Sequence, residues 1–122
     1  MKLIHHLSDS AQAITAYGPG FIILNGERID KSLVVSPTRS LRVWAESFER
    51  LTCDHFEQLL VLQPELVLLG TGAVFRFPAP GLTRSLLAAG IGVECMDTAA
   101  ACRTYTVLSS EGRQVVAALI LP

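Results

Sequence analysis

The chain has few charged residues and almost no excess of either sign. Of its 122 residues 17% are charged, and ten Lys and Arg against eleven Asp and Glu give a formal net charge of −1. This balance argues against the basic field that draws a protein to nucleic acid or anionic lipid. We expect no nucleic-acid partner. Because half of the residues are hydrophobic, the composition also argues against a disordered chain.

Long apolar runs are missing as well. Runs such as residues 66–69 are far shorter than the roughly 20 residues needed to cross a bilayer. We therefore expect no membrane insertion. Residues 1–7 carry one lysine and two histidines where a secretory signal has an apolar core. The sequence predicts a cytoplasmic protein and, at this length, one domain over residues 1–122.

Cysteine and histidine are sparse. Cys53, Cys95 and Cys102 form no C-x-x-C pair, and one of them would remain over in any disulfide scheme, as expected for reduced cytosolic thiols. His5 and His6 are adjacent, so on an extended segment their side chains would point to opposite faces. We expect no metal site and no cofactor. Packed thiols are favoured over cysteine nucleophiles, because no histidine partner is evident near Cys95 or Cys102.

The first half of the chain predicts an antiparallel meander. Residues 21–24 are typical of a strand, and Asn25-Gly26 favours a tight turn. Residues 29–35 would then return as the partner strand. Ser36-Pro37 ends that strand, because proline has no N–H to donate to a ladder. Residues 41–44 alternate as a half-buried third strand.

The second half predicts helices that alternate with buried strands. We expect helices capped at Asp54 and at Thr98, a helix over residues 82–89, and a left-handed helix end at Gly112. The expected strands are residues 65–69, 93–96 and 115–120. Such alternation indicates parallel pairing. The predicted fold is α/β, a three-layer sandwich with a central mixed, largely parallel sheet and an N-terminal antiparallel meander.

Gly70-Thr71-Gly72 follows the buried strand 65–69. The element is either a structural turn or a ligand loop, since ligands favour the carboxyl ends of parallel strands, but neither GxGxxG nor GxxxxGK[ST] is present. Glu94 lies in an apolar strand, so its carboxylate either faces solvent or pairs with Arg113 or Arg76. If these groups converge at one cleft they would bind a small polar ligand. The candidate ligand-binding residues are Ser36, Gly70, Thr71, Gly72, Glu94 and Arg113.

Four aromatic residues lie near predicted loops: Trp44, Phe48, Phe75 and Phe77. Exposed aromatic patches mark partner sites, whereas packing into the core is the commoner fate of such side chains. The sequence leaves both interpretations open.

Several motifs, taken in order along the chain, resemble one protein family. They are Gly18-Pro19-Gly20, Ser36-Pro37, Leu68-Leu69-Gly70-Thr71-Gly72, Gly90-Ile91-Gly92-Val93-Glu94-Cys95-Met96-Asp97-Thr98, Ala101-Cys102-Arg103-Thr104-Tyr105, and Leu108 with Glu111-Gly112-Arg113. The chain resembles the small α/β domain family that contains mitochondrial complex I assembly factor 3 and the adipogenesis-associated domain protein. The likeness extends over nearly the whole chain.

The resemblance implies the three-layer fold, supplies no catalytic residues, and leaves two functional hypotheses. The first is a non-catalytic interaction or assembly protein that assists respiratory complex I, with complex I subunits or assembly intermediates as partners. The second is a small-molecule binding protein or enzyme that uses a cleft near Gly70-Thr71-Gly72. Edge strands of the meander also permit a homodimer, because they expose unpaired backbone groups.

Overall fold

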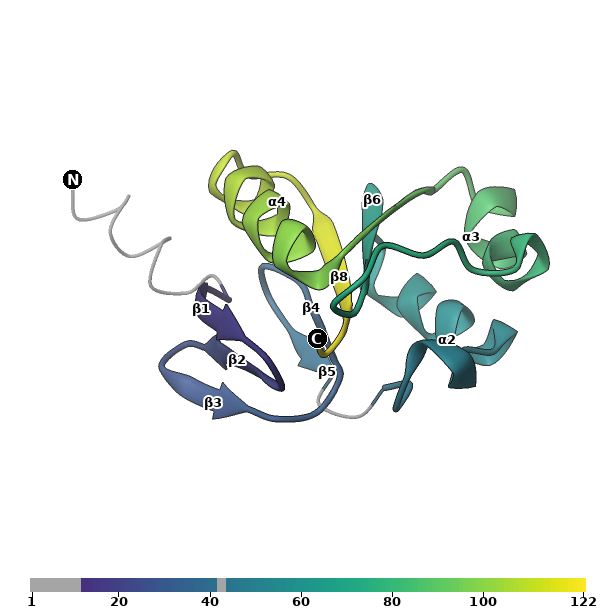
Figure 1. Cartoon of the computed structure of the whole chain (residues 1–122). Helices are drawn as coiled ribbons and strands as arrows, with labels where there is room; N and C mark the ends of the chain where they lie inside the picture. Colours follow the sequence, from purple (N-terminus) through teal and green to yellow (C-terminus); the bar gives the residue numbers. More distant parts are fainter. Residues whose placement is uncertain (1–11, 42–43) are drawn as a thin grey trace.

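Two β-sheets form the framework of the part that this computed structural model describes, residues 12–41 and 44–122 (Figure 1). The smaller sheet is three-stranded and antiparallel, in the order β1-β2-β3, and the larger is five-stranded and mixed, in the order β5-β4-β8-β6-β7. In the larger sheet β8, β6 and β7 are parallel, whereas β4 is antiparallel to both β8 and β5. The strands are β1 (Ile14–Gly18), β2 (Phe21–Leu24), β3 (Glu27–Ile29), β4 (Leu33–Val35), β5 (Ser40–Leu41), β6 (Leu66–Thr71), β7 (Gly92–Met96) and β8 (Val115–Ile120).

The helices cover the two faces of the larger sheet. The longest, α4, and the small sheet lie on one side of it, and α2 and α3 lie on the other (Figure 1). The helical elements are η1 (Phe48–Arg50), α2 (Cys53–Glu57), η2 (Gln58–Leu62), η3 (Pro80–Thr83), α3 (Arg84–Ala88) and α4 (Thr98–Ser110), where η denotes a 3-10 helix.

Strand β8 shows how the layers are built from its sequence. All six of its residues are buried, and successive side chains point to opposite faces. Leu119 and its alternate neighbours pack with Tyr105 of α4 and with the small sheet. Ile120 and its alternate neighbours pack instead with Phe56 of α2 and Leu86 of α3. The α/β sandwich, with its mixed central sheet and N-terminal antiparallel meander, is therefore confirmed.

The expected course of the meander is wrong in its second half. The predicted partner strand, residues 29–35, is divided between the two sheets: β3 pairs with β2, and β4 pairs with β8. The reason is burial, because all three residues of β4 are inaccessible to solvent and need cover on both faces. The expected strand 41–44 is reduced to β5, and residues 42–43 lie outside the described part. Trp44 is buried and its indole N–H donates to the carbonyl of His55 (3.1 Å).

Two helix starts differ from prediction. Thr52, not Asp54, is the N-cap of α2, and its backbone N–H donates to Nδ1 of His55 (3.0 Å). Asp97, not Thr98, caps α4 by accepting a hydrogen bond from the N–H of Ala100 (2.8 Å). The left-handed helix end at the glycine after α4 is confirmed, with φ at +80°. The two adjacent histidines near the N-terminus lie outside the described residues.

Gly70 lies close against the first residue of α4 and generates a stability prediction. A Cβ there would lie 2.9 Å from Oγ1 and 3.1 Å from Cα of Thr98. We expect Gly70→Ala to lower the free energy of unfolding by about 1–3 kcal/mol, the usual cost of overpacking. Urea denaturation measures this change.

Gly92 provides the control, because a Cβ there meets only Leu66 Cδ1 at an ordinary 3.5 Å. Gly92→Ala is expected to change stability by less than about 0.5 kcal/mol. Equal effects of the two substitutions would contradict the close approach of Gly70 to α4.

Candidate functional site

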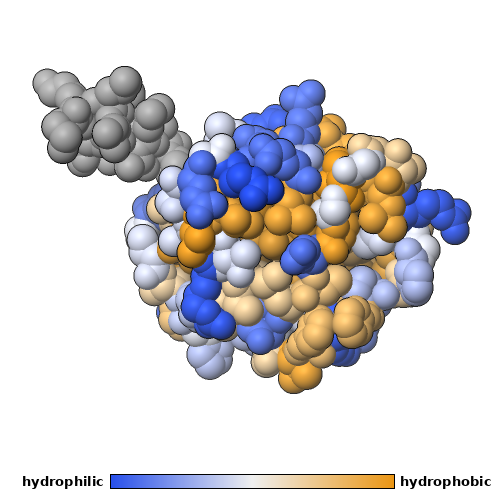
Figure 2. Space-filling model, turned by 90° about the horizontal axis from the view of Figure 1, so that it is seen from above, coloured by the Kyte–Doolittle hydropathy of each residue, from blue (hydrophilic) through white to orange (hydrophobic). Residues whose placement is uncertain are grey.

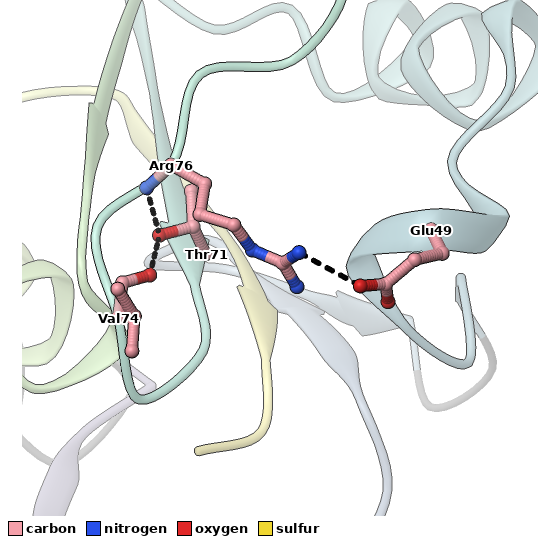
Figure 3. Close-up of polar contacts among 4 residues, drawn as sticks. All are labelled: Glu49, Thr71, Val74 and Arg76. Atoms are coloured by element: carbon pink, nitrogen blue, oxygen red, sulfur yellow. Dashed lines mark hydrogen bonds and ion pairs between the residues drawn. The ribbon is translucent and has the colours of Figure 1, made fainter.

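The loop that follows β6 leaves the sheet at the carboxyl ends of two parallel strands, β6 and β8. Gly72 has φ at +99°, a conformation that glycine adopts without strain. The hydroxyl of Thr71 lies 2.7 Å from the carbonyl oxygen of Val74, to which it donates, and accepts from the N–H of Arg76 at 3.1 Å (Figure 3). One buried side chain therefore closes the loop into a compact turn.

The base of this loop is fixed by the first residue of α4. The buried hydroxyl of Thr98 donates to the carbonyl of Ile120 and accepts from the N–H of Gly72 (2.8 Å). The backbone N–H of Thr98 donates in turn to the carbonyl of Gly72 (2.9 Å). The loop is thus attached to both a helix and the central sheet.

Arg76 joins the same loop to η1. Its Nη1 donates to Oε2 of Glu49 at 2.7 Å, as Figure 3 shows, and its guanidinium lies over the ring of Phe48, 4.4 Å from the ring centroid. The hydrogen bond from Arg76 is the main reason why the pKa of the Glu49 carboxyl lies below its usual value, and a hydrogen bond from the backbone N–H of Glu49 is the second. Both side chains remain substantially exposed, so this pair positions the loop more than it stabilises the fold.

A cleft of about 460 Å³ lies between the loop and η1. A second hollow of about 540 Å³ shares the lining residues Glu46 and Leu121 with it, so the two form a pair of neighbouring hollows. We call this the sheet-end groove, because Ile120 and Leu121, at the end of β8, line it. Its other lining residues are Asp30, Lys31, Ser32, Trp44, Ala45, Ser47, Phe48, Glu49, Thr71, Gly72, Ala73, Val74 and Arg76.

Beyond Thr71, the loop exposes large apolar side chains. Phe77 is 77% exposed, Val74 66% and Phe75 49%, and the two phenylalanine rings contact each other with centroids 4.7 Å apart. We call residues 74–77 the aromatic loop. Apolar surface is interspersed with hydrophilic side chains on the face shown in Figure 2. Among the four aromatic candidates, therefore, Phe75 and Phe77 face solvent, while Trp44 is buried.

The structure brings only some of the candidate ligand residues together. Thr71 and Gly72 line the sheet-end groove, and Gly70 is buried just before them, against Thr98. Ser36 is buried after β4, where its hydroxyl bonds the backbone N–H and carbonyl of Arg39. That hydroxyl is therefore part of a turn.

Glu94 and Arg113 lie away from the groove. Glu94 is exposed in the middle of the edge strand β7, so its carboxylate faces solvent. Nε of Arg113 donates to Oε1 of Glu65 at 3.0 Å, before the first residues of β6 and β8 and thus at the opposite end of these strands. The two predicted cationic partners of Glu94 are instead paired with Glu49 and Glu65.

The full lining of the groove was not predictable from local sequence patterns. Glu46 and Leu121 are far apart along the chain and meet only because η1 packs against the end of β8. The pairing of Arg76 with Glu49 spans 27 positions, beyond the reach of any local motif. Within residues 12–41 and 44–122, no group of three or more His, Cys, Asp or Glu side chains is placed to hold a metal ion.

The sequence has relatives among named proteins. Residues 14–120 match the model of a family described as protein of unknown function (DUF498/DUF598). The Bos taurus protein named NADH dehydrogenase (ubiquinone) 1 alpha subcomplex assembly factor 3 is 32% identical, over 100% of this chain and 67% of its own length. The chain thus spans about two thirds of that relative. The Francisella tularensis protein named 13 kDa major membrane protein is 29% identical, over 85% of this chain and 86% of its own.

Solved structures share the fold. A Bordetella parapertussis protein superposes with a TM-score of 0.85 at 39% identity, covering 91% of this chain and 96% of its own. A Bartonella henselae structure described as an outer membrane protein has a TM-score of 0.82 at 26% identity, covering 93% and 98%. In the present chain, no helix among the described residues is long and apolar enough to span a bilayer.

The three thiols are expected to differ in reactivity. Cys53 is exposed, whereas burial raises the pKa of Cys102 to about 12 and, together with the charge of Glu94, raises that of Cys95. Because the thiolate is the reactive form, a disulfide reagent at pH 8 should label Cys53 first and Cys102 only after unfolding. Mass spectrometry of the labelled peptides measures the order. Rapid labelling of native Cys102 would contradict its burial on the inner face of α4.

The Arg76–Glu49 pair predicts a shift that NMR titration can detect. In Arg76→Gln the carboxylate of Glu49 loses its charged donor, so the pKa of Glu49 should rise toward its usual value. Arg84→Gln is the control, since Arg84 is exposed on α3 and does not contact Glu49 through any described ion pair. An unchanged pKa of Glu49 in Arg76→Gln would refute the pairing in solution.

Proposed function

Since this chain belongs to the DUF498/DUF598 family of proteins of unknown function, we propose that it is a non-catalytic interaction protein that assists the assembly of respiratory complex I. Relatives at 30–32% identity, from Homo sapiens and Bos taurus, are named as assembly factors of that NADH dehydrogenase. We further propose that it works in the cytoplasm, with complex I subunits or assembly intermediates as its partners.

The observation that supports an interaction protein is the exposed aromatic loop. Two phenylalanine rings in mutual contact, with an exposed Val74 and an arginine between them in sequence, present the residue types that dominate binding energy at protein interfaces. A large exposed apolar side chain costs free energy in water, and a partner surface that covers it recovers this cost.

The loop is also held in one arrangement before any partner arrives. Thr71 closes it, Thr98 fixes its base and Arg76 ties it to η1. Because ordering a flexible loop reduces binding affinity, an ordered loop binds with a smaller entropic loss. These contacts explain why a polar side chain such as Thr71 is buried against the backbone of the aromatic loop.

The alternative is a small-molecule binding protein or enzyme that uses the cleft near Gly70-Thr71-Gly72. The position of Thr71 and Gly72 in the sheet-end groove supports it, at the carboxyl ends of parallel strands where ligands often bind. The hydroxyl of Thr71, however, is already engaged by Arg76 and Val74. We favour the interaction protein because the loop's polar groups bond one another and its apolar groups face outward.

The test is affinity purification of the tagged protein from its own cells, with membranes solubilised in mild detergent and co-purifying proteins quantified by mass spectrometry. We expect enrichment of complex I subunits or assembly intermediates. The double variant Phe75→Ser/Phe77→Ser should lose that enrichment, since truncation of an interface aromatic costs about 2 kcal/mol, or roughly 30-fold in Kd.

Val107→Ser is the matched control, because Val107 is 55% exposed on α4 and lies outside the aromatic loop. It should retain the co-purifying subunits, and circular dichroism should show all variants folded. Recovery of the protein alone, or only as a homodimer, would contradict the assembly function. Ligand screening against the groove would then test the alternative.

A further inference from the structure

We infer that the sheet-end groove binds an extended apolar segment of a partner protein, with a basic side chain of that segment against Glu46. This inference rests on the proposed function only in taking the partner to be a protein. It adds the chemistry of the bound segment and a site beside the aromatic loop.

The shape of the groove suits an extended polypeptide segment better than a compact small molecule. Its two hollows, of about 460 and 540 Å³, are open and share the lining residues Glu46 and Leu121. An extended polypeptide rises about 3.3 Å per residue, so it can follow both hollows and bury little of itself in either one. A small molecule in one open hollow would leave much of its surface in water, unlike the ligands of enclosed pockets.

The lining of the groove combines apolar side chains with polar and charged ones. Ile120 and Leu121 line the first hollow, Leu121 and the buried Trp44 line the second, and Phe48 lies beneath the guanidinium of Arg76. Apolar side chains of a bound segment would therefore meet aliphatic and aromatic surface. Val74 belongs both to this lining and to the aromatic loop, so the two surfaces are continuous.

The charges of the lining identify the preferred side chain. At one end Asp30 and Lys31 are neighbours of opposite sign, and at the other Arg76 is bonded to Glu49. Glu46 is exposed where the two hollows meet, and within the described residues no ion pair or hydrogen bond engages its carboxylate. Among the described lining residues, one negative charge at the junction therefore has no partner, which favours a lysine or arginine and disfavours an acidic side chain.

The same charge decides between classes of ligand. A phosphate, a nucleic acid or an anionic lipid surface would place negative charge near Glu46, while Arg76 of the lining is already paired with Glu49. An apolar peptide segment that carries one positive charge can instead place its apolar side chains against the apolar lining and its charge against Glu46. A second copy of this chain is the other protein that could occupy the groove, and the experiment below distinguishes it from a partner segment.

Selection from a random twelve-residue peptide library on the immobilised full chain tests the inference. Wild type should enrich apolar residues around one fixed Lys or Arg. Glu46→Lys should change the enrichment at that position to Asp or Glu. Glu57→Lys is the control, because Glu57 is exposed on α2 and does not line the groove, and it should select as wild type does.

Calorimetry with the most enriched peptide provides the second measurement. Glu46→Lys should weaken binding at least about tenfold, or about 1.4 kcal/mol, and a peptide with Glu in place of the basic residue should restore it. NMR shifts on adding the peptide should centre on Trp44, Ile120 and Leu121, which line the groove.

Three results would overturn the inference. They are the absence of any selected peptide, an enrichment that Glu46→Lys leaves unchanged, and NMR shifts away from the groove. Dimerisation of the protein that the peptide reverses would assign the groove to a second copy and would also overturn it. If peptides bind with the charge reversal but complex I subunits do not co-purify, the groove stands and the proposed assembly function fails.

Discussion

The hydroxyl of Thr98 is the contact on which the site depends. It bridges the end of β8, through the carbonyl of Ile120, and the start of the loop after β6, through the N–H of Gly72. Both backbone groups lie where parallel strands stop pairing, and buried backbone groups without partners are costly. Gly70 makes the bridge possible, because any side chain there would occupy the position of the threonine. The hydroxyl oxygen of Thr98 thus links the start of α4 to the end of β8 and to the loop that follows β6.

In this arrangement the hydrophobic core and the exposed aromatic loop are separate parts of the molecule. The two hydrophobic clusters lie on opposite faces of the central sheet and contain none of the residues of the aromatic loop. Changes in that loop should consequently affect recognition with little effect on folding. Conversely, the small sheet β1-β2-β3 and α4 complete the core on the face that does not carry η1.

Local sequence patterns were enough to predict the elements that depend only on neighbouring residues. The turn at Asn25-Gly26, with φ at +53° and +83°, and the buried strand β8 were both predictable from neighbouring residues. The passage of β4 into the central sheet was not, because its partner in β8 lies more than eighty positions away. Of the candidate site, Thr71 and Gly72 were found because they follow a buried strand, whereas Glu46 carries no local signal of its place in the groove.

The position of Glu94 bears on how the protein behaves at high concentration. Strand β7 is an edge of the central sheet and pairs regularly with β6 over five residues, so its outer side offers a template to any other extended chain. Two such edges aligned antiparallel about their midpoints would bring two carboxylates face to face, and like charges directly opposite each other destabilise a ladder. A single exposed acid in the middle of the edge thus disfavours the growth of the sheet by pairing of two copies in this register.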